Sequence, residues 1–401
     1  MARREEPGYR GIATQGRTSF NLSTETLPRI KPSRHGRVQT GMGMLHHLRN
    51  LNEIAYPRYL VQGPTHIVLG VNNFCNLKCL MCDVGTDSKE TNFGGNLMGS
   101  NARSMPLSLF HRIVDQIADF CPEAHLAFAF TEPLAWAPMG DALRYAQKKG
   151  IPASVTTNGL LLPKRAKEIS GLCANLSVSL DGPEPVHDHI RQRSGSYARA
   201  VQGIEALASM DPNVKIGVFC TITEWNASHL VEFLSIMSTL PIHRVGLTHN
   251  NFVTSEQART HNVRFDGAFH ATPSNVFSAN PQAIALDTLS QQLEQVSRSH
   301  YPFAVNIQPH VIELRDLETY YHSPDTALGK RCRDANRIVM IDSDGEAVPA
   351  HGRCFRFPIA NIREKPLSEI WNHPALGSLR KALADNGGLL PACTRCCGGF
   401  G

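Results

Sequence analysis

The sequence has no run of 18 or more apolar residues, and its first residues, MARREEPGYRG, contain no apolar segment of the kind that a signal peptide requires. The first absence argues against a membrane-spanning helix, and the second argues against secretion. We therefore expect a soluble, cytoplasmic protein with no membrane partner.

A large excess of one charge is also missing, because the formal net charge is only +5. Much of the positive charge lies in the first 40 residues, a stretch with few apolar residues that reads as a basic tail: Arg3, Arg4, Arg10, Arg17, Arg29, Lys31, Arg34 and Arg37. No basic surface interleaved with aromatic residues follows it, which argues against nucleic acid as a partner. The composition, 42% hydrophobic and 19% charged, is sufficient for a large folded core.

Cysteine, in contrast, is plentiful: the chain has 11. In a reducing compartment, clustered thiols more often hold metal or carry out redox chemistry than form disulfides. Three of them, Cys75, Cys79 and Cys82, lie within eight residues in the spacing C-x3-C-x2-C. At the cysteine frequency of this chain, that spacing arises by chance roughly 0.01 times per chain.

This loop lacks a fourth cysteine. A structural zinc site normally has four protein ligands, whereas a [4Fe–4S] cluster held by three cysteines keeps one iron free for a small molecule. The preceding residues 65–73, THIVLGVNN, predict a buried strand that leads into the loop. The carboxyl end of a parallel strand is where barrel proteins keep their chemistry.

Cys75, Cys79 and Cys82 resemble the signature loop of the radical S-adenosylmethionine (radical SAM) superfamily. In that family the open iron binds the amino and carboxylate groups of SAM. Leu80 stands where the family usually has an aromatic residue. The resemblance implies a SAM-binding [4Fe–4S] cluster, SAM itself, and an electron donor of the flavodoxin or ferredoxin type.

Strand-like and helix-like segments alternate after the loop, as βα units require. The strands are expected at residues 65–73, 124–133, 151–159, 174–182, 214–226 and 242–252, and the helices at 107–119, 139–150, 163–171, 197–209 and 227–238. We therefore predict an α/β protein with an irregular extension at 1–60, a partial (β/α)6 TIM-like barrel at 61–300, and a small C-terminal α+β domain (a β-hairpin plus a helix) that binds a cluster at 301–401.

Polar motifs follow the second, third and fourth predicted strands: FTEP, TTNG and SLDG. FTEP stands where the family has Gly-Gly-Glu-Pro. The resemblance implies that Thr131 and Glu132 bind the SAM ammonium, that Asn158 and Ser179 also contact SAM, with Ser179 at the ribose, and that Arg191 pairs with the SAM carboxylate. Structural alternatives remain, since Glu132 could cap a helix and Ser179 could simply end a strand.

Five more cysteines lie in the last 70 residues. Around Cys332 and Cys354 we expect a β-hairpin that turns at Asp344-Gly345. Between Cys354 and Cys393 we expect one helix that begins at Ser368 and ends before Gly387-Gly388. The spacing C-x21-C-x38-C-x2-C resembles the twitch form of the SPASM region, which binds one auxiliary [4Fe–4S] cluster. The implied ligands, with Cys397 as a substitute for the last, are Cys332, Cys354, Cys393 and Cys396; a zinc knuckle is the alternative.

Candidate catalytic residues are fewer. Cys220 or Cys397 could return a hydrogen atom to a substrate radical, and His249 with Asn250, at the end of the sixth strand, could contact a polar substrate. His351 lies near Cys354 and could tune the auxiliary cluster or transfer a proton. The other two cysteines, Cys121 and Cys173, are expected to pack in the core.

The resemblance implies an enzyme that forms a 5′-deoxyadenosyl radical from SAM. We predict an oxidoreductase that uses this radical to take a hydrogen atom from a polar small molecule of the sugar, aminocyclitol or nucleoside type. The auxiliary cluster would accept an electron, giving dehydrogenation. Two alternatives stay open: a radical SAM epimerase or peptide-modifying enzyme, and a non-catalytic iron–sulfur or zinc protein.

Overall fold

The computed structural model describes residues 48–400. The basic tail predicted from the arginines and Lys31 of residues 1–40 lies outside this range. Residues 48–55, expected to be irregular, form a helix. Within the described range no helix is long and apolar enough to cross a membrane.

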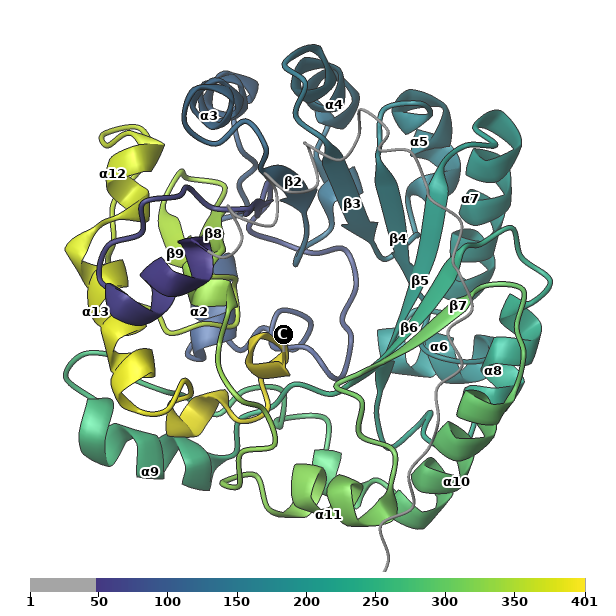
Figure 1. Cartoon of the computed structure of the whole chain (residues 1–401). Coiled ribbons are helices and arrows are strands. Elements are labelled where there is room, and N and C mark those ends of the chain that lie inside the picture. The colour runs from purple at the N-terminus through teal and green to yellow at the C-terminus, as the bar shows by residue number, and fades with distance from the viewer. Residues whose placement is uncertain (1–47, 401) are drawn as a thin grey trace, which may run out of the picture. The chain divides into compact units, whose positions relative to one another are not determined.

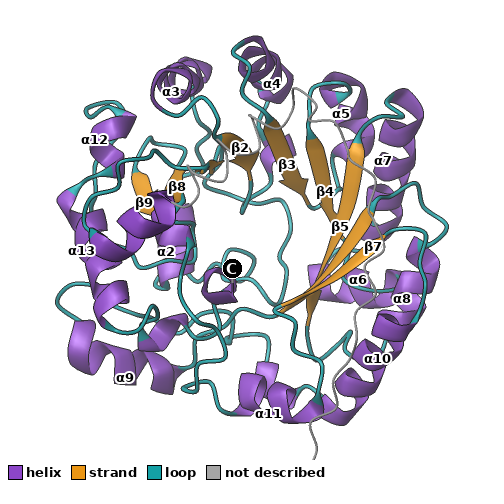
Figure 2. Ribbon diagram, in the orientation of Figure 1, coloured by secondary structure: helices purple, strands orange, loops and turns teal. Residues whose placement is uncertain are grey.

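One mostly parallel sheet organises the molecule (Figures 1 and 2). Its order is β7-β6-β5-β4-β3-β2-β1-β8-β9, and only β9 is antiparallel to its neighbour. The strands are β1 (His66–Leu69), β2 (His125–Phe128), β3 (Ala153–Thr157), β4 (Asn175–Ser179), β5 (Lys215–Ile222), β6 (Arg244–His249), β7 (Ala304–Gln308), β8 (Ile338–Ile341) and β9 (Ala347–Pro349). The six predicted strands and the partial barrel are confirmed, and β7 extends it.

The helices are α2 (Asn92–Leu97), α3 (Leu107–Phe120), α4 (Met139–Lys148), α5 (Leu162–Ile169), α6 (Glu184–Arg191), α7 (Ser196–Met210), α8 (Leu230–Met237), α9 (Ser255–Phe265), α10 (Leu286–Arg298), α11 (Leu314–His322), α12 (Leu367–Trp371) and α13 (Pro374–Asp385). Helices α3, α4, α5, α7, α8 and α10 lie on the outer side of the curved sheet, whereas α9 and α11 lie away from its strands (Figure 2).

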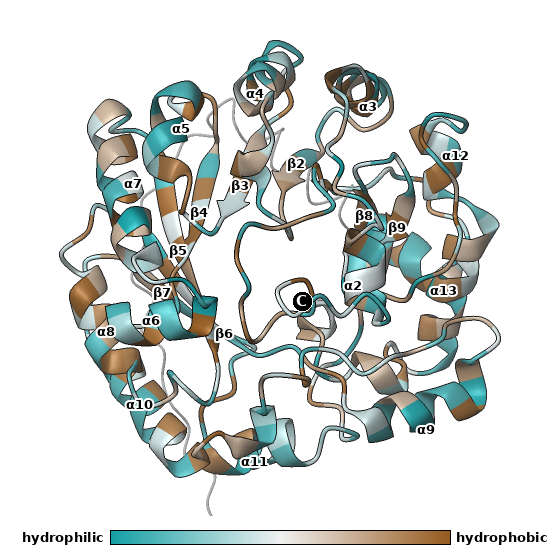
Figure 3. Ribbon diagram, turned by 180° about the vertical axis from the view of Figure 1, so that it is seen from behind, coloured by the Kyte–Doolittle hydropathy of each residue, from teal (hydrophilic) through white to brown (hydrophobic). Residues whose placement is uncertain are grey.

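The pattern of α3 explains why these helices pack on the sheet. Leu109, Ile113 and Ile117 recur at four-residue spacing, so they share one face, and all are buried in the main core. The outer helices alternate between hydrophobic and hydrophilic residues along their length (Figure 3). Burial of one apolar face therefore fixes each helix against the strands.

The predicted hairpin with its turn at Asp344-Gly345 is present as β8 and β9, but it is not separate from the barrel. Strand β8 pairs in parallel with β1, with His66 opposite Ile338 and Leu69 opposite Ile341. The hairpin therefore continues the barrel sheet beyond its first strand.

The prediction of one helix after Ser368 is wrong. The chain forms α12 and α13 with a break at Asn372-His373, because Pro374 cannot continue a helix and instead occupies the first turn of α13. The side chain of His373 caps that helix by accepting a hydrogen bond from the backbone N–H of Ala375.

Arg395 anchors the C-terminal segment to α11. Its buried guanidinium lies over the ring of Tyr320. It donates hydrogen bonds to five carbonyl oxygens, those of Thr319, Tyr320, Ser323, Thr326 and Thr394. Three of the acceptors, the carbonyls of Thr319, Tyr320 and Ser323, lie at the carboxyl end of α11, where backbone carbonyls lack the partners that a continuing helix would supply.

We predict that Arg395→Leu lowers the free energy of unfolding by about 3 kcal/mol or more, because one hydrogen bond to a charged group contributes about 1.5–3 kcal/mol. The measurement is urea unfolding under anaerobic conditions. The control is Arg315→Leu, since Arg315 lies on the same helix with its side chain 83% exposed; its change should stay within about 0.5 kcal/mol. Equal stabilities of the two variants would contradict the anchoring role.

Candidate active site

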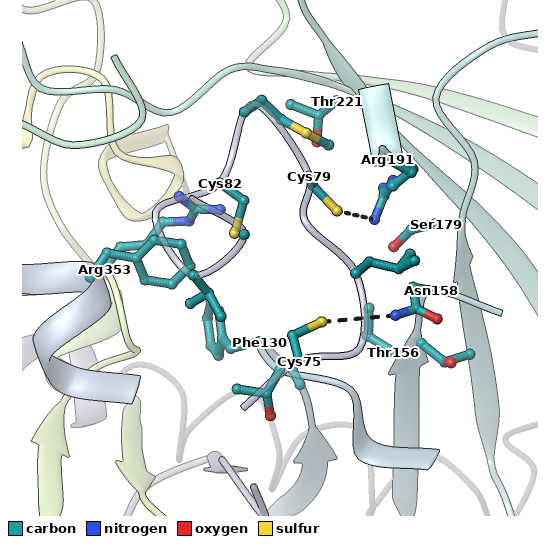
Figure 4. Close-up of a pocket in the computed structure, with 18 of the residues that line it drawn as sticks. Cys75, Cys79, Cys82, Phe130, Thr156, Asn158, Ser179, Arg191, Thr221 and Arg353 are labelled. Carbon is teal, nitrogen blue, oxygen red and sulfur yellow. Dashed lines mark hydrogen bonds between the residues drawn. The ribbon is translucent and has the colours of Figure 1, made fainter. Parts of the chain in front are cut away.

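The three-cysteine loop follows β1 and lines a cavity at the carboxyl ends of the strands (Figure 4). We call it the rim cavity; it holds about 240 Å³. Its lining includes Cys75, Cys79, Cys82, Phe93, Phe130, Thr131, Thr156, Asn158, Ser179, Arg191, Thr221, Asn250, Asn251 and Arg353. Strands far apart in the sequence thus place their end residues around the three thiols.

The loop is held closely by its own backbone and by a neighbouring segment. A Cβ atom added at Gly85 would overlap the backbone of Cys79, so this position needs glycine. Asp83 accepts hydrogen bonds from the Ser274 hydroxyl (2.6 Å) and the Asn275 backbone N–H (2.7 Å). These contacts fix the direction of the chain beside Cys82.

Burial raises the pKa of the Cys75 thiol to about 11 and that of Cys79 to about 12. Two polar groups nevertheless point at these sulfur atoms. Asn158 Nδ2 lies 3.9 Å from Cys75 Sγ, and Arg191 Nη1 lies 3.7 Å from Cys79 Sγ. Donors of this kind favour the negative charge of metal-bound thiolates.

Two polar atoms of predicted or suspected site residues have no protein partner. Thr131 Oγ1 and Asn250 Nδ2 are buried without a hydrogen bond, although both residues line the rim cavity. Buried polar groups are nearly always paired, so such atoms are suited to bind a ligand.

Glu132 is placed differently from its neighbour Thr131. Its carboxylate is fully buried and is absent from the cavity lining. It accepts hydrogen bonds from the backbone N–H groups of Leu134 (2.9 Å) and Asn158 (2.8 Å) and from the Thr157 hydroxyl (2.7 Å). Glu132 therefore caps the short 3-10 helix at Pro133–Ala135 and joins the ends of β2 and β3.

Phe130 stands at the first of the two positions that are glycine in the family motif. Its φ is +79°, in the left-handed region that favours glycine. The ring lines the rim cavity and lies edge-on to Phe93, with ring centres 6.0 Å apart. Phe130 thus has a left-handed backbone conformation, and its side chain adds an aromatic ring to the cavity lining.

Arg191 lines the rim cavity from α6 and is already paired. Its Nε lies 2.5 Å from Asp181 Oδ2. Asp181 in turn accepts from the Thr221 backbone N–H (2.9 Å), which ties the end of β5 to the same network.

Cys220 and His249 lie at or near the ends of β5 and β6, but they do not line the rim cavity. Alternation along β5 points Thr221 into the cavity and buries Cys220 in the core, where Asn226 Nδ2 lies 3.6 Å from its sulfur. His249 contacts the Tyr321 hydroxyl (2.8 Å) and the Val311 carbonyl (2.9 Å). Burial lowers the pKa of His249 to about 4, so its ring is neutral and structural.

Four tail cysteines, Cys332, Cys354, Cys393 and Cys396, line a second, smaller cavity of about 50 Å³, which we call the tail cavity. Its lining also includes His351 and Arg353. Cys397 is not among the lining residues.

Cys397 instead lies beside His351 and Cys396, and the ligand atoms of the three are within 4.8 Å of one another. His351 Nε2 is 3.6 Å from Cys396 Sγ and 3.5 Å from Asp334 Oδ2. Burial lowers the pKa of His351, but Asp334 and Cys397 outweigh it and raise the pKa to about 9.

Arg353 is a residue that the sequence-based reasoning missed. It lines both cavities, and its position next to Cys354 was the available signal. Asn251, Thr221 and Phe130 were missed as well. Their signal was weaker, since each is an ordinary residue at the end of a predicted strand.

Comparison with known families agrees with this geometry. Residues 69–236 match the radical SAM superfamily, and residues 332–397 match the SPASM iron–sulfur cluster-binding domain. The two matched segments contain the three-cysteine loop and the tail cysteines, respectively.

Among curated proteins, the chain is 22% identical over 327 residues to Fe-coproporphyrin III synthase of Methanosarcina barkeri, covering 76% of this chain and 73% of the relative. It is 23% identical over 380 residues to pre-heme d1 synthase of Dinoroseobacter shibae, covering 88% and 86%. The fold is similar to that of SuiB of Streptococcus suis bound to S-adenosylmethionine, with a TM-score of 0.56, 16% identity, and coverage of 91% of this chain and 79% of SuiB. The chain is therefore a radical SAM enzyme with a C-terminal SPASM region.

Proposed function

We propose that this protein binds a [4Fe–4S] cluster on Cys75, Cys79 and Cys82, binds SAM in the rim cavity, and oxidises a polar small molecule held between the rim and tail cavities. The observation that carries the proposal is the convergence of the three thiols with unpaired polar atoms in one cavity. With cluster and SAM bound, the cofactors supply a 5′-deoxyadenosyl radical that removes a hydrogen atom from a C–H bond.

The donor set suits this cofactor. Among residues 48–400, no fourth thiol lines the rim cavity, so three cysteines would leave one coordination position open. Thr131, whose Oγ1 has no partner, lines the same cavity and is available to a ligand of that position. The expectation of SAM contacts at Asn158, Ser179 and Arg191 is retained as part of this proposal.

We assign Glu132 a positioning role. Its carboxylate accepts from the backbone N–H of Asn158 and so fixes the residue whose amide reaches toward Cys75 and Asn76. Glu132 would then act on SAM binding through Asn158.

The tail cavity suits an auxiliary cluster on Cys332, Cys354, Cys393 and Cys396. Four thiols around one small cavity would leave no open ligand position on a cluster held there, which favours a role in accepting one electron from the substrate radical. Asn96 on α2 donates to the Cys354 carbonyl (2.8 Å) and holds this site to the segment that follows the three-cysteine loop.

The position of the thiols argues against epimerisation. A hydrogen-atom donor must reach the substrate, but in the described part of the chain the only thiols that line the rim cavity are the three proposed ligands. Cys220 is buried in the core, and Cys397 lines neither the rim cavity nor the tail cavity. Dehydrogenation is therefore the reaction that we propose.

A tetrapyrrole is a second candidate substrate, favoured by the names of two of the curated relatives, Fe-coproporphyrin III synthase and pre-heme d1 synthase. A peptide is a third, since one SuiB structure with a TM-score of 0.55 is bound to its precursor peptide.

The first test is an iron count. Anaerobically reconstituted protein should hold about eight irons, as two [4Fe–4S] clusters require, and should form 5′-deoxyadenosine from SAM with dithionite. Replacing Cys75, Cys79 and Cys82 together by alanine should leave about four irons and abolish 5′-deoxyadenosine. Cys173→Ala is the control and should keep about eight. Survival of eight irons in the triple variant would remove the assignment.

A second prediction concerns the shape of the loop. Gly85→Ala should reduce the iron content to about four and abolish SAM cleavage, because the added methyl group displaces the Cys79 backbone. Gly267→Ala is the matched control, since a Cβ there meets nothing within 4 Å. Iron and sulfide analysis of both variants measures the effect. Full cluster content in Gly85→Ala would show that the close contact does not matter.

A third prediction concerns SAM binding. Ser179→Ala should weaken it by about 1–3 kcal/mol, as expected for a lost polar contact in a buried site. Ser177→Ala serves as the control, because that hydroxyl lies on the same strand and contacts Arg244 (3.2 Å) outside the cavity lining. Anaerobic equilibrium dialysis gives both affinities. Equal SAM affinity in the two variants would exclude Ser179 as a contact.

A further inference from the structure

Arg353 lies where the two proposed cluster sites meet. It follows β9 and directly precedes Cys354, and its side chain lines the rim cavity as well as the tail cavity. In Figure 4 its guanidinium points into the rim cavity on the side of Cys82, opposite Arg191 and Ser179. A ligand bound there would have one proposed cluster on either side.

The side chain is held in place without being neutralised. Its guanidinium carbon lies 4.1 Å from the centre of the Phe93 ring, and Phe93 is buried on α2. The same helix holds the backbone around Arg353, since Asn96 Nδ2 donates to the carbonyls of Gly352 (3.0 Å) and Cys354 (2.8 Å). The guanidinium is therefore preorganised.

Arg353 has no anionic partner among residues 48–400. Its Nη1 is buried without a hydrogen bond, and no carboxylate there forms an ion pair with it. Arg191, the other arginine that lines the rim cavity, is paired with Asp181. Arg353 is half-buried, its Nη1 has no partner, and the planar fork of arginine matches a carboxylate.

We propose that Arg353 binds a carboxylate of the substrate and thereby places the substrate between the rim and tail cavities. This inference rests on the proposed function and names the chemical class of its substrate. Asn250, whose Nδ2 is an unpaired donor in the same cavity, supplies a second contact to an oxygen acceptor. The substrate is therefore an acid with a further polar oxygen, which a neutral sugar is not.

A rival explanation is that Arg353 only offsets the negative charge of cluster-bound thiolates. In that case a carboxylate in solution gains nothing from Arg353, and replacing the arginine changes the properties of the clusters alone. The two explanations differ in whether a simple carboxylate binds.

The experiment uses propionate as the smallest probe and propionamide as its uncharged analogue. Binding to the reconstituted protein, with SAM at saturation, is measured by saturation-transfer NMR. Arg353→Gln should weaken propionate binding about tenfold or more, as expected for a lost hydrogen bond to a charged group, and Arg353→Lys should retain part of it. Propionamide should bind wild type about tenfold or more weakly than propionate does.

Arg356→Gln is the matched control. It makes the same change of charge three residues away on an exposed side chain outside both cavities, and its propionate binding should equal that of wild type. Iron content verifies that each variant is folded and loaded.

Three results would overturn the proposal: no propionate binding to wild type, equal binding to Arg353→Gln, or equal binding of propionamide. Loss of SAM binding in Arg353→Gln would reassign the arginine to SAM and would also overturn it. Formation of 5′-deoxyadenosine by wild type is scored separately, so failure of the proposed function is distinguished from failure of this inference.

Discussion

The parallel pairing of β1 with β8 is the interaction on which the rest of the arrangement depends. Strand β1 leads into the three-cysteine loop, and β8 leads through β9 to Arg353 and Cys354. Because β8 pairs with β1 and β9 pairs with β8, the segment that carries Arg353 and Cys354 is attached to the same sheet as the three-cysteine loop, although the two are far apart in the sequence. The tail is thus part of the barrel sheet, and the two cavities share one lining residue, Arg353.

Several buried titratable side chains stabilise this arrangement, because they form hydrogen bonds to the backbone of neighbouring segments. Glu132 joins the ends of β2 and β3, Asp181 joins Arg191 to the end of β5, and His249 joins β6 to residues near α11. Each has its hydrogen bonds satisfied by protein. The groups left for a ligand are uncharged or cationic, namely Thr131, Asn250 and Arg353. A cavity of this character suits anionic and oxygen-rich ligands.

The sequence predicted the six barrel strands, the hairpin and both cysteine groups, because alternation, turn residues and cysteine spacing are local signals. It did not predict that the hairpin joins β1, since strand pairing depends on contacts across the chain. It also did not reveal that Cys220 and His249, at or near the ends of β5 and β6, are absent from the lining of the rim cavity. Successive side chains at the end of a strand point alternately into the cavity and into the core. A shift of one residue therefore decides on which of the two sides a side chain lies. Arg353 was missed because its importance comes from the absence of a partner, which spacing does not reveal.

The β1–β8 pairing also sets an order of events during synthesis of the protein. Thr65 and Arg337, which begin the pairing, are 272 residues apart in the sequence. Until the ribosome has released residues 338–341, β1 is an edge strand with one unpaired side, and closing so long a loop is entropically costly. Strand β1 therefore gains its second neighbour only after residues 338–341 have been made, and a protein truncated before β8 would leave this edge open to aggregation.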